Sequence, residues 1–389
     1  MTSKLDRRDF LLTAGGLAAA AAWPNPVFGQ DAKTPAKKYK TERVVVVAFA
    51  GGVRTRDTIG APANVPKMMQ IAKRGVTLPA VKAANLGHFG ATLSILTGVD
   101  EPYGIRENDR GDYPTIFEML RKNARLAAGD VWLSATGGAQ QQNLTYSYDR
   151  RYGQAYGANL VSSDGVFNEE FKKILASFGE ARLPEGAEAE ALNDLRGALA
   201  RSAAERGGGA PDLNSATTLR SIEKFLLDEL KGDAARITGP GAADAKSLRT
   251  AANLFRAFKP KVMGVVLQQA DVAHGSYNAY VEVIRRNDEE LGRFWDLIQA
   301  DPSLRDTTSI FILPEFGRNK DLNERNGLDH GDGSPDLGTV ALVAAGPDFK
   351  KDKIVKTETR TIDVASTVCE LFGVKCEAKK SKPIRDLFA

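Results

Sequence analysis

The sequence predicts an α/β fold in which a mixed, mostly parallel sheet lies between layers of helices and is interrupted by a helical insertion. Short apolar runs, several of them rich in valine and isoleucine, alternate along the chain with segments of helical character. Continuous apolar runs are typical of strands buried on both faces, as in a parallel sheet covered by helices. The chain has 389 residues, which is enough for one large core.

The strands are predicted from these apolar runs. Residues 43–49 read Arg-Val-Val-Val-Val-Ala-Phe and end just before Gly51 and Gly52, as a buried strand followed by a turn would. Further strands are predicted at residues 76–81, 130–134, 261–267, 308–313 and 339–345.

The helices are predicted between the strands. Residues 64–74 have a helical pattern, and residues 113–120 begin with a proline near their start, which is common in the first turn of a helix. Residues 277–300 are amphipathic, with apolar side chains near one face, and residues 363–372 form a last short helix.

The character of the chain changes between about residues 160 and 258. This stretch is helical and charged, and it is broken by three glycines at 207–209 and by Gly239-Pro240-Gly241. We therefore expect a helical insertion or cap at residues 160–258, within an α/β domain that spans residues 40–389.

The first residues predict an export signal. Arg7 and Arg8 form a twin-arginine pattern, and a weakly apolar stretch rich in alanine and glycine follows at residues 11–22. This predicts a twin-arginine signal peptide at residues 1–29, cleaved after about Gly29, and hence a periplasmic or extracellular location. The alternative is a retained anchor, although the stretch is short for a membrane span, and we expect none in the mature chain.

Two cysteines occur in the chain, Cys369 and Cys376. In an oxidising compartment they would close a small loop at the end of the last helix. The sequence therefore predicts a structural disulfide, the alternative being two unpaired thiols.

The three histidines of the chain all lie in polar segments that contain glycine, at or near the ends of predicted strands. His88 precedes a Phe-Gly pair, His274 follows the strand at 261–267, and His330 lies in Leu-Asp-His-Gly-Asp. Turns at one edge of an α/β sheet are where such proteins place their chemistry. The alternative is three exposed loop histidines.

Two of these histidines belong to a predicted metal site. Asp271, His274 and His330 are one carboxylate and two imidazoles, a set that suits a metal ion with one open position. We expect one divalent metal ion, with Zn²⁺ favoured and Mn²⁺ or Ca²⁺ as alternatives. The formal net charge of +4 gives no reason to expect a nucleic-acid partner.

At this point the sequence resembles the alkaline phosphatase superfamily, and within it most closely the twin-arginine-exported, sulfatase-like proteins of unassigned activity. The similar segments are Ser94-Ile95-Leu96-Thr97-Gly98, Glu315-Phe316-Gly317-Arg318 with Asp329-His330, and Thr361–Thr367. The resemblance covers about residues 43–135 and 261–389. It implies an alkaline phosphatase or sulfatase-like fold, a metal-dependent site and the hydrolysis of phosphate or sulfate esters.

Three departures from the family pattern concern its second metal site. Ala50 stands where the family has aspartate, His88 aligns with the nucleophile, and Glu315-Phe316-Gly317 replaces Asp-His-Gly. The second site is therefore predicted to be degenerate, while Asp271, His274 and His330 retain the first.

The remaining roles are assigned on this basis. His88 is the candidate nucleophile or general acid, and Glu315 is a candidate base or further ligand. Arg54 and Arg318 would hold the anionic group of the substrate, the alternative being salt bridges to nearby acids. Thr92 is a second candidate nucleophile if the alignment is set differently.

Three functions remain open from the sequence. The first is an exported hydrolase that acts on a small phosphate or sulfate ester through a single metal site. The second is an inactive superfamily member that binds an anionic ligand or a periplasmic protein partner. The third is an accessory periplasmic protein that docks through its helical block.

Overall fold

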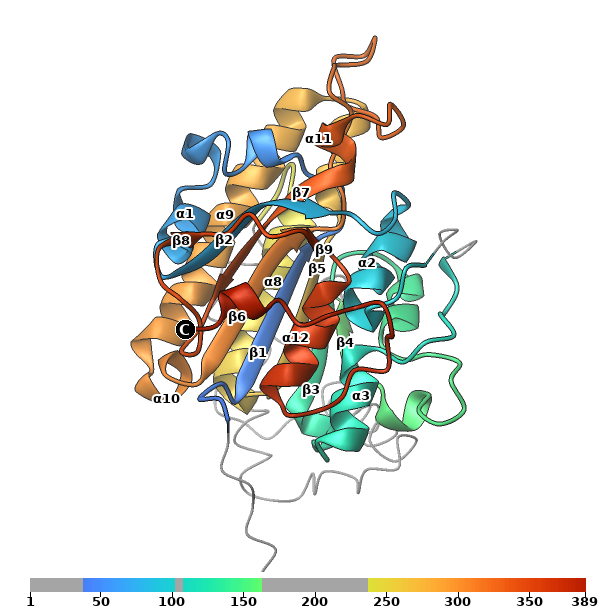
Figure 1. The fold of residues 1–389 in the computed structure, drawn as a ribbon. Helices are drawn as coiled ribbons and strands as arrows, with labels where there is room; N and C mark the ends of the chain where they lie inside the picture. Colours follow the sequence, from blue (N-terminus) through green and yellow to red (C-terminus); the bar gives the residue numbers. More distant parts are fainter. Residues whose placement is uncertain (1–37, 102–107, 163–236) are drawn as a thin grey trace, which may run out of the picture. The chain divides into compact units, whose positions relative to one another are not determined.

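The structure is a computed structural model that describes residues 38–101, 108–162 and 237–389 (Figure 1). The predicted signal peptide at residues 1–29 and most of the predicted insertion lie outside the described residues. No helix in the part of the chain that the structure describes is long and apolar enough to cross a membrane.

The centre of the fold is a nine-stranded sheet with the order β4-β3-β5-β1-β6-β7-β2-β8, in which β9 also pairs with β2. The strands are β1 (Arg43–Phe49), β2 (Gly75–Lys82), β3 (Val131–Ala135), β4 (Asn159–Ser162), β5 (Val262–Leu267), β6 (Thr308–Pro314), β7 (Thr339–Ala345), β8 (Lys353–Ile354) and β9 (Thr359–Arg360). All neighbouring pairs are parallel except those that β7 makes with β6 and β2. The sheet is therefore mixed and mostly parallel, as predicted.

The register of the central strands brings three chain segments to one edge of the sheet. Phe49 at the end of β1 lies opposite Leu267 at the end of β5 and opposite Pro314 at the end of β6. The segments that follow these three strands therefore leave the sheet side by side. This edge, formed by the carboxyl ends of parallel strands, is the usual ligand edge of an α/β sheet.

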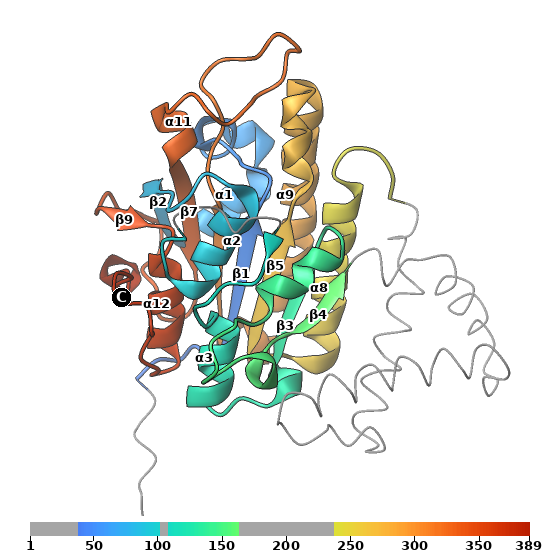
Figure 2. The same ribbon diagram turned by 90° about the vertical axis from the view of Figure 1, so that its right-hand side faces the viewer.

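Helices cover both faces of the sheet, as Figures 1 and 2 show. The helices are α1 (Pro66–Ala72), α2 (His88–Thr97), α3 (Ile116–Asn123), α8 (Ala242–Phe258), α9 (Tyr277–Ala300), α10 (Pro302–Arg305), α11 (Pro335–Gly338) and α12 (Asp363–Leu371). Val46 of β1 packs in one apolar cluster with α2, α3 and α12. Its neighbour Val47 packs in the other, with α1, α8 and α9. Because side chains alternate along each strand, every strand contributes residues to the apolar clusters on both faces of the sheet.

The predicted strands and long helices are found close to their predicted bounds, but two predictions need correction. Residues 88–97 form α2 rather than a turn, so His88 is the first residue of a helix. The predicted insertion is also too long. Residues 159–162 form strand β4 of the sheet, and α8 packs against β5 and α9 with Leu248, Leu254 and Phe255 fully buried. Both ends of the 160–258 stretch therefore belong to the α/β core.

Candidate metal centre

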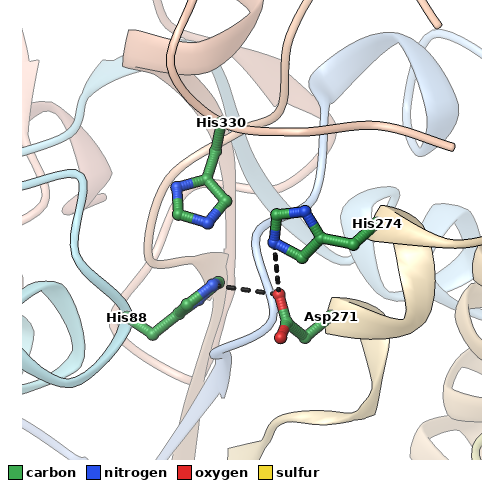
Figure 3. Close-up of side chains that lie close together, drawn as sticks. All are labelled: His88, Asp271, His274 and His330. Atoms are coloured by element: carbon green, nitrogen blue, oxygen red, sulfur yellow. Dashed lines mark ion pairs between the residues drawn. The ribbon is translucent and has the colours of Figure 1, made fainter. Parts of the chain in front are cut away.

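Four side chains converge beyond the carboxyl ends of β5, β1 and β6: His88, Asp271, His274 and His330 (Figure 3). Each offers one ligand atom, and these atoms all lie within 4.8 Å of one another. No other group of three or more histidine, cysteine or acidic side chains among the described residues is arranged to hold a metal ion. The three histidines of the chain thus meet in one cluster, together with the predicted aspartate.

Asp271 and His274 are positioned by a short 3-10 helix, η9 (Gln269–His274), which follows β5 directly. The helix packs against the turn after β1 because Gly51 has no side chain. A Cβ at Gly51 would lie 2.5 Å from the backbone nitrogen of Asp271 and 2.7 Å from the carbonyl oxygen of Gln268. Glycine at this position therefore lets η9 lie against the sheet edge.

His88 reaches the cluster from the start of α2, which ends at Gly98 with a positive φ of 76°. Its Nδ1 lies 2.6 Å from Oε1 of Glu315 and 3.1 Å from the carbonyl oxygen of Ala50. With the Nδ1 proton donated to Glu315, Nε2 points into the cluster, 3.0 Å from Oδ1 of Asp271 (Figure 3). This Nε2 is buried and has no hydrogen bond of acceptable geometry, so it is an orphaned polar atom.

His274 repeats this arrangement with different residues. Its Nδ1 lies 2.7 Å from Oδ1 of Asp329, and its Nε2 lies 3.3 Å from Oδ1 of Asp271. Both histidines therefore direct Nε2 at the same carboxylate oxygen while a second carboxylate holds Nδ1. Metal-binding histidines commonly donate their other ring N–H to a carboxylate in this way.

His330 comes from the loop after β6, which Asn319 holds in place. The side-chain oxygen of Asn319 accepts hydrogen bonds from the backbone N–H groups of Gly331 and Asp332, at 2.6 and 3.0 Å. The His330 ring centroid lies 4.7 Å from that of His88 and 5.0 Å from that of His274. Burial, together with the charges of His88 and Arg318, lowers the pKa of His330 to about 4, so its ring is neutral at pH 7.

The carboxylates around the cluster favour a positive charge within it. Burial raises the pKa of Asp271, but the close contact with His88 and the hydrogen bond from Arg318 outweigh it and hold that pKa well below its usual range. Burial likewise lowers the pKa of His88, but Asp271 and Glu315 outweigh it and raise the pKa to about 9. Two carboxylates thus favour a positive charge at His88, which a proton or a bound metal ion would supply.

The residues fit a divalent metal ion. Three imidazole nitrogens and one carboxylate oxygen are a donor set that Zn²⁺ accepts in tetrahedral geometry. The orphaned Nε2 of His88 supports this fit, because a metal ion would satisfy it. The sequence pattern had assigned His88 to catalysis rather than to metal binding. Its closeness to the predicted ligand set appears only once α2 is folded onto the sheet.

Arg318, for which the sequence predicts a substrate-binding role, lies buried behind the cluster. Its side chain has 0% exposure, and its guanidinium donates hydrogen bonds to the carbonyl oxygens of Gly51 and Leu328 and to Oδ1 of Asp271. Arg318 therefore ties together the segments after β1, β5 and β6. In this structure its guanidinium is occupied by these contacts.

Arg54, the other predicted substrate-binding residue, is also buried. Its guanidinium pairs with both carboxylate oxygens of Asp57, at 2.6 and 3.1 Å, and also donates to the carbonyl oxygens of Asn319 and Lys320. The side chain is buried, so these contacts leave little of the guanidinium to hold an anionic group. The salt bridge to a nearby acid, the alternative left open by the sequence, is the one found.

Glu315 and Thr92, for which the sequence predicts catalytic roles, are buried beside His88. The side chain of Glu315 has 0% exposure and accepts hydrogen bonds from His88 and from Oγ1 of Thr92, each at 2.6 Å. Thr92 is itself buried. Both groups are buried, and Glu315 contacts His88 and Thr92, an arrangement that suits a positioning role for Glu315.

The cysteines lie away from this centre, around the end of α12. Cys369 is buried and Cys376 is half-buried, and both are free thiols in the structure. The nearby Cys369 thiol lowers the pKa of Cys376 to about 6. The disulfide remains a prediction.

Comparison with known proteins identifies the fold. No protein-family model and no curated protein matches the sequence. Among solved structures, the chain is similar to wild-type alkaline phosphatase PafA, with a TM-score of 0.54, 12% identity and coverage of 90% of this chain and 99% of that chain. A PafA variant gives a TM-score of 0.57, 11% identity and the same coverage.

A protein in the alkaline phosphatase superfamily from Vibrio parahaemolyticus is also similar, with a TM-score of 0.50, 11% identity and coverage of 90% of this chain and 71% of that chain. At these identities the likeness concerns the fold. Together with the mixed sheet and its helical layers, it confirms the predicted fold class. The chain has the fold of the alkaline phosphatase superfamily.

Proposed function

We propose that this protein is an exported hydrolase that acts on a small phosphate or sulfate ester through one divalent metal ion held by His88, Asp271, His274 and His330. Zn²⁺ suits the donor set best, and Mn²⁺ or Ca²⁺ are the alternatives. The observation that carries the proposal is the convergence of two Nε2 atoms on Oδ1 of Asp271, at 3.0 and 3.3 Å. The likeness in fold to metal-dependent phosphatases supports it.

The metal ion would polarise the ester and make water a better nucleophile at neutral pH. The protein's own contribution is to hold the site in shape. Glu315 and Asp329 fix the ring orientation of His88 and His274, which leaves both Nε2 lone pairs directed inward. Asp271 balances the positive charge and is half-exposed, so a substrate anion can approach from its side.

A second candidate is an inactive member that binds an anionic ligand or a periplasmic protein partner. One observation favours it specifically. The side chain aligned with the family's nucleophile, His88, is held by Glu315 and turned into the cluster as a fourth donor. Four protein donors fill a tetrahedral shell, as in structural metal sites, whereas catalytic sites keep one position open.

The export route is part of the proposal and rests on the twin-arginine pattern at Arg7 and Arg8. It places the mature protein in the periplasm or outside the cell. Expression with and without residues 1–29, followed by fractionation, tests it. Retention of the full-length chain in the cytoplasm would contradict it.

The first test of the site is metal content, measured by elemental mass spectrometry on protein purified without chelator. We expect about one metal ion per chain in the wild type and a loss of that ion in His274→Ala. Asp321→Asn, which changes an exposed acid in the same loop as His330, is the control and should retain the metal. A metal-free wild type would contradict both candidates that use the site.

Turnover then separates the two candidates. The metal-loaded protein is assayed with p-nitrophenyl phosphate and p-nitrophenyl sulfate, beside the His274→Ala variant. Turnover that follows the metal content of each preparation supports the hydrolase. One metal ion per chain with no turnover, together with binding of inorganic phosphate, supports the inactive member.

A further inference from the structure

A second feature of the molecule lies at the opposite edge of the sheet. A pocket of about 500 Å³ is lined by Lys40, Lys73, Arg74, Trp295, Gln299, Arg305, Asp306, Gly346, Pro347 and Lys351. Lys40 precedes β1 and Asp306 precedes β6, while Gly346 follows β7, which runs antiparallel to β6. The pocket is therefore at the amino ends of the parallel strands, whereas the metal centre lies beyond their carboxyl ends.

The pocket is strongly basic. Its lining has five cationic side chains and one carboxylate. That carboxylate, Asp306, is already paired with the guanidinium of Arg305, at 3.0 and 3.3 Å. Arg74 donates to the side-chain oxygen of Gln299 at 2.7 Å, a neutral partner that leaves its charge uncompensated.

The three lysines of the lining are exposed and have few partners. Within the described part of the chain, the ammonium groups of Lys73 and Lys351 make no ion pair, and that of Lys40 has only a longer-range attraction to Asp306. Like charges gathered around one cavity repel one another, and a bound anion relieves that repulsion. The charge pattern therefore points to an anionic ligand.

The size and lining of the pocket indicate a small ligand that carries phosphate or sulfate groups. A volume of about 500 Å³ is in the range of sites for small molecules. Trp295 is almost wholly buried and, with Pro347, gives part of the wall an apolar character that strengthens charge interactions nearby. Lysine ammonium groups act as point charges for phosphate and sulfate, and the planar guanidinium of Arg74 suits their paired oxygens.

We propose that this pocket is a second anion-binding site, distinct from the metal centre, and that it takes a compact ligand with two or more phosphate or sulfate groups. Several anionic groups are needed to use several cations from separate elements, namely the segment before β1, the end of α1 and the loop after β7. A single anionic group would engage only part of the lining. The site does not depend on the proposed hydrolase activity.

Isothermal titration calorimetry with inorganic pyrophosphate tests the proposal, using the whole mature chain at fixed ionic strength. We expect saturable binding in the wild type that weakens as salt rises. Lys73→Gln/Arg74→Gln should weaken it by about tenfold or more, because each cation makes charge-assisted hydrogen bonds to the ligand. Lys379→Gln/Lys380→Gln, which removes two exposed cations outside the pocket, should bind as the wild type does.

The metal centre is tested in the same experiment through His274→Ala, which removes a metal ligand and leaves the pocket unchanged. Pyrophosphate should bind this variant with unchanged affinity. Three results would overturn the proposal: no saturable binding to the wild type, equal weakening in the Lys379→Gln/Lys380→Gln control, or loss of binding in His274→Ala.

Discussion

On each side of the candidate metal centre a carboxylate binds Nδ1 of a histidine, but one carboxylate is exposed and the other is buried. On one side Asp329 holds Nδ1 of His274, and on the other Glu315 holds Nδ1 of His88. The side chain of Asp329 is 42% exposed and the hydrogen bond from His274 lowers its pKa, whereas Glu315 is wholly buried and burial raises its pKa to about 7. Both carboxylates orient a ring, but only Asp329 has solvent as a substitute partner.

This difference bears on the proposed metal site. A buried carboxylate at Glu315 is costly without a cation near it. Here His88 supplies the positive charge or the proton, and it directs its other nitrogen to the cluster with Asp271. Under the proposed function, His88 and Glu315 would together support one bound metal ion.

Arg318 joins the two sides, and its loss is expected to have the largest effect. Arg318→Met keeps the length of the side chain but leaves the buried carbonyl groups of Gly51 and Leu328 without the guanidinium that they accept from, and it removes one of the cations beside Asp271. We expect the free energy of unfolding to fall by about 3–5 kcal/mol, measured by urea denaturation. Arg325→Met, in the same loop but exposed, is the control. Equal stability of the two variants would contradict the role of Arg318.

Asp244 is a second buried carboxylate, on the same side of the cluster as His274. It accepts hydrogen bonds from the backbone N–H groups of Gln268 and Gln269. Burial raises its pKa from 3.8 to about 6. The folded chain therefore binds more protons than the unfolded chain between these values. Its contribution to stability is present below pH 4 and is lost as pH rises through 6, by about 3 kcal/mol.

The variant Asp244→Asn cannot ionise and should lack this contribution. Urea unfolding at several pH values between 4 and 7 measures the difference in free energy of unfolding between wild type and variant. We expect the difference to change across this range in favour of the variant at higher pH. Parallel curves for the two proteins would show that burial does not raise the pKa of this carboxyl group.

The next largest effects are expected for variants of the two carboxylates that bind the histidine rings, Glu315 and Asp329. Glu315→Gln should weaken Zn²⁺ binding by up to about 100-fold, because no solvent can replace the buried carboxylate. Asp329→Asn should weaken it by about tenfold or less, since water can take its place. Competition with a fluorescent zinc chelator measures both. The comparison fails if the two variants bind equally well or in the reverse order.

Thr92→Val should give the smallest effect. It removes one of the two side-chain hydrogen bonds to Glu315 while keeping the shape of the side chain. We expect a loss of about 1–3 kcal/mol in the free energy of unfolding by thermal denaturation. Thr92→Ser retains the hydroxyl and is the control. Turnover abolished in Thr92→Val but kept in Thr92→Ser, with metal content unchanged, would instead make Thr92 a nucleophile.

Much of the fold could be predicted because its central strands are continuous apolar runs, as at residues 43–49 and 261–267. Helix α2 could not. Its sequence includes Gly90 and the β-branched residues Thr92 and Ile95, which are weak helix formers. Packing against the sheet and α12 makes this segment helical, and that packing has no local signal.

The sequence indicates which residues gather near the site, but it does not indicate which side chains contact one another. The sequence predicts polar residues after each strand, and the structure groups three of them, Asp271, His274 and His330, in one cluster with His88. The sequence does not show that Arg318 points inward or that Glu315 is sealed behind His88. Those facts depend on which loops touch, which is set by contacts such as the close approach of η9 to Gly51.

The register of β5, β1 and β6 has a consequence for how the protein assembles. His88 follows β2, Asp271 follows β5 and His330 follows β6, so no fragment of the chain holds the complete cluster. Strand pairings between such distant segments form slowly, because the chain must close long loops first. Uptake of a metal ion during refolding should therefore lag behind the recovery of secondary structure. An export route that carries folded chains would deliver the protein with its centre already assembled.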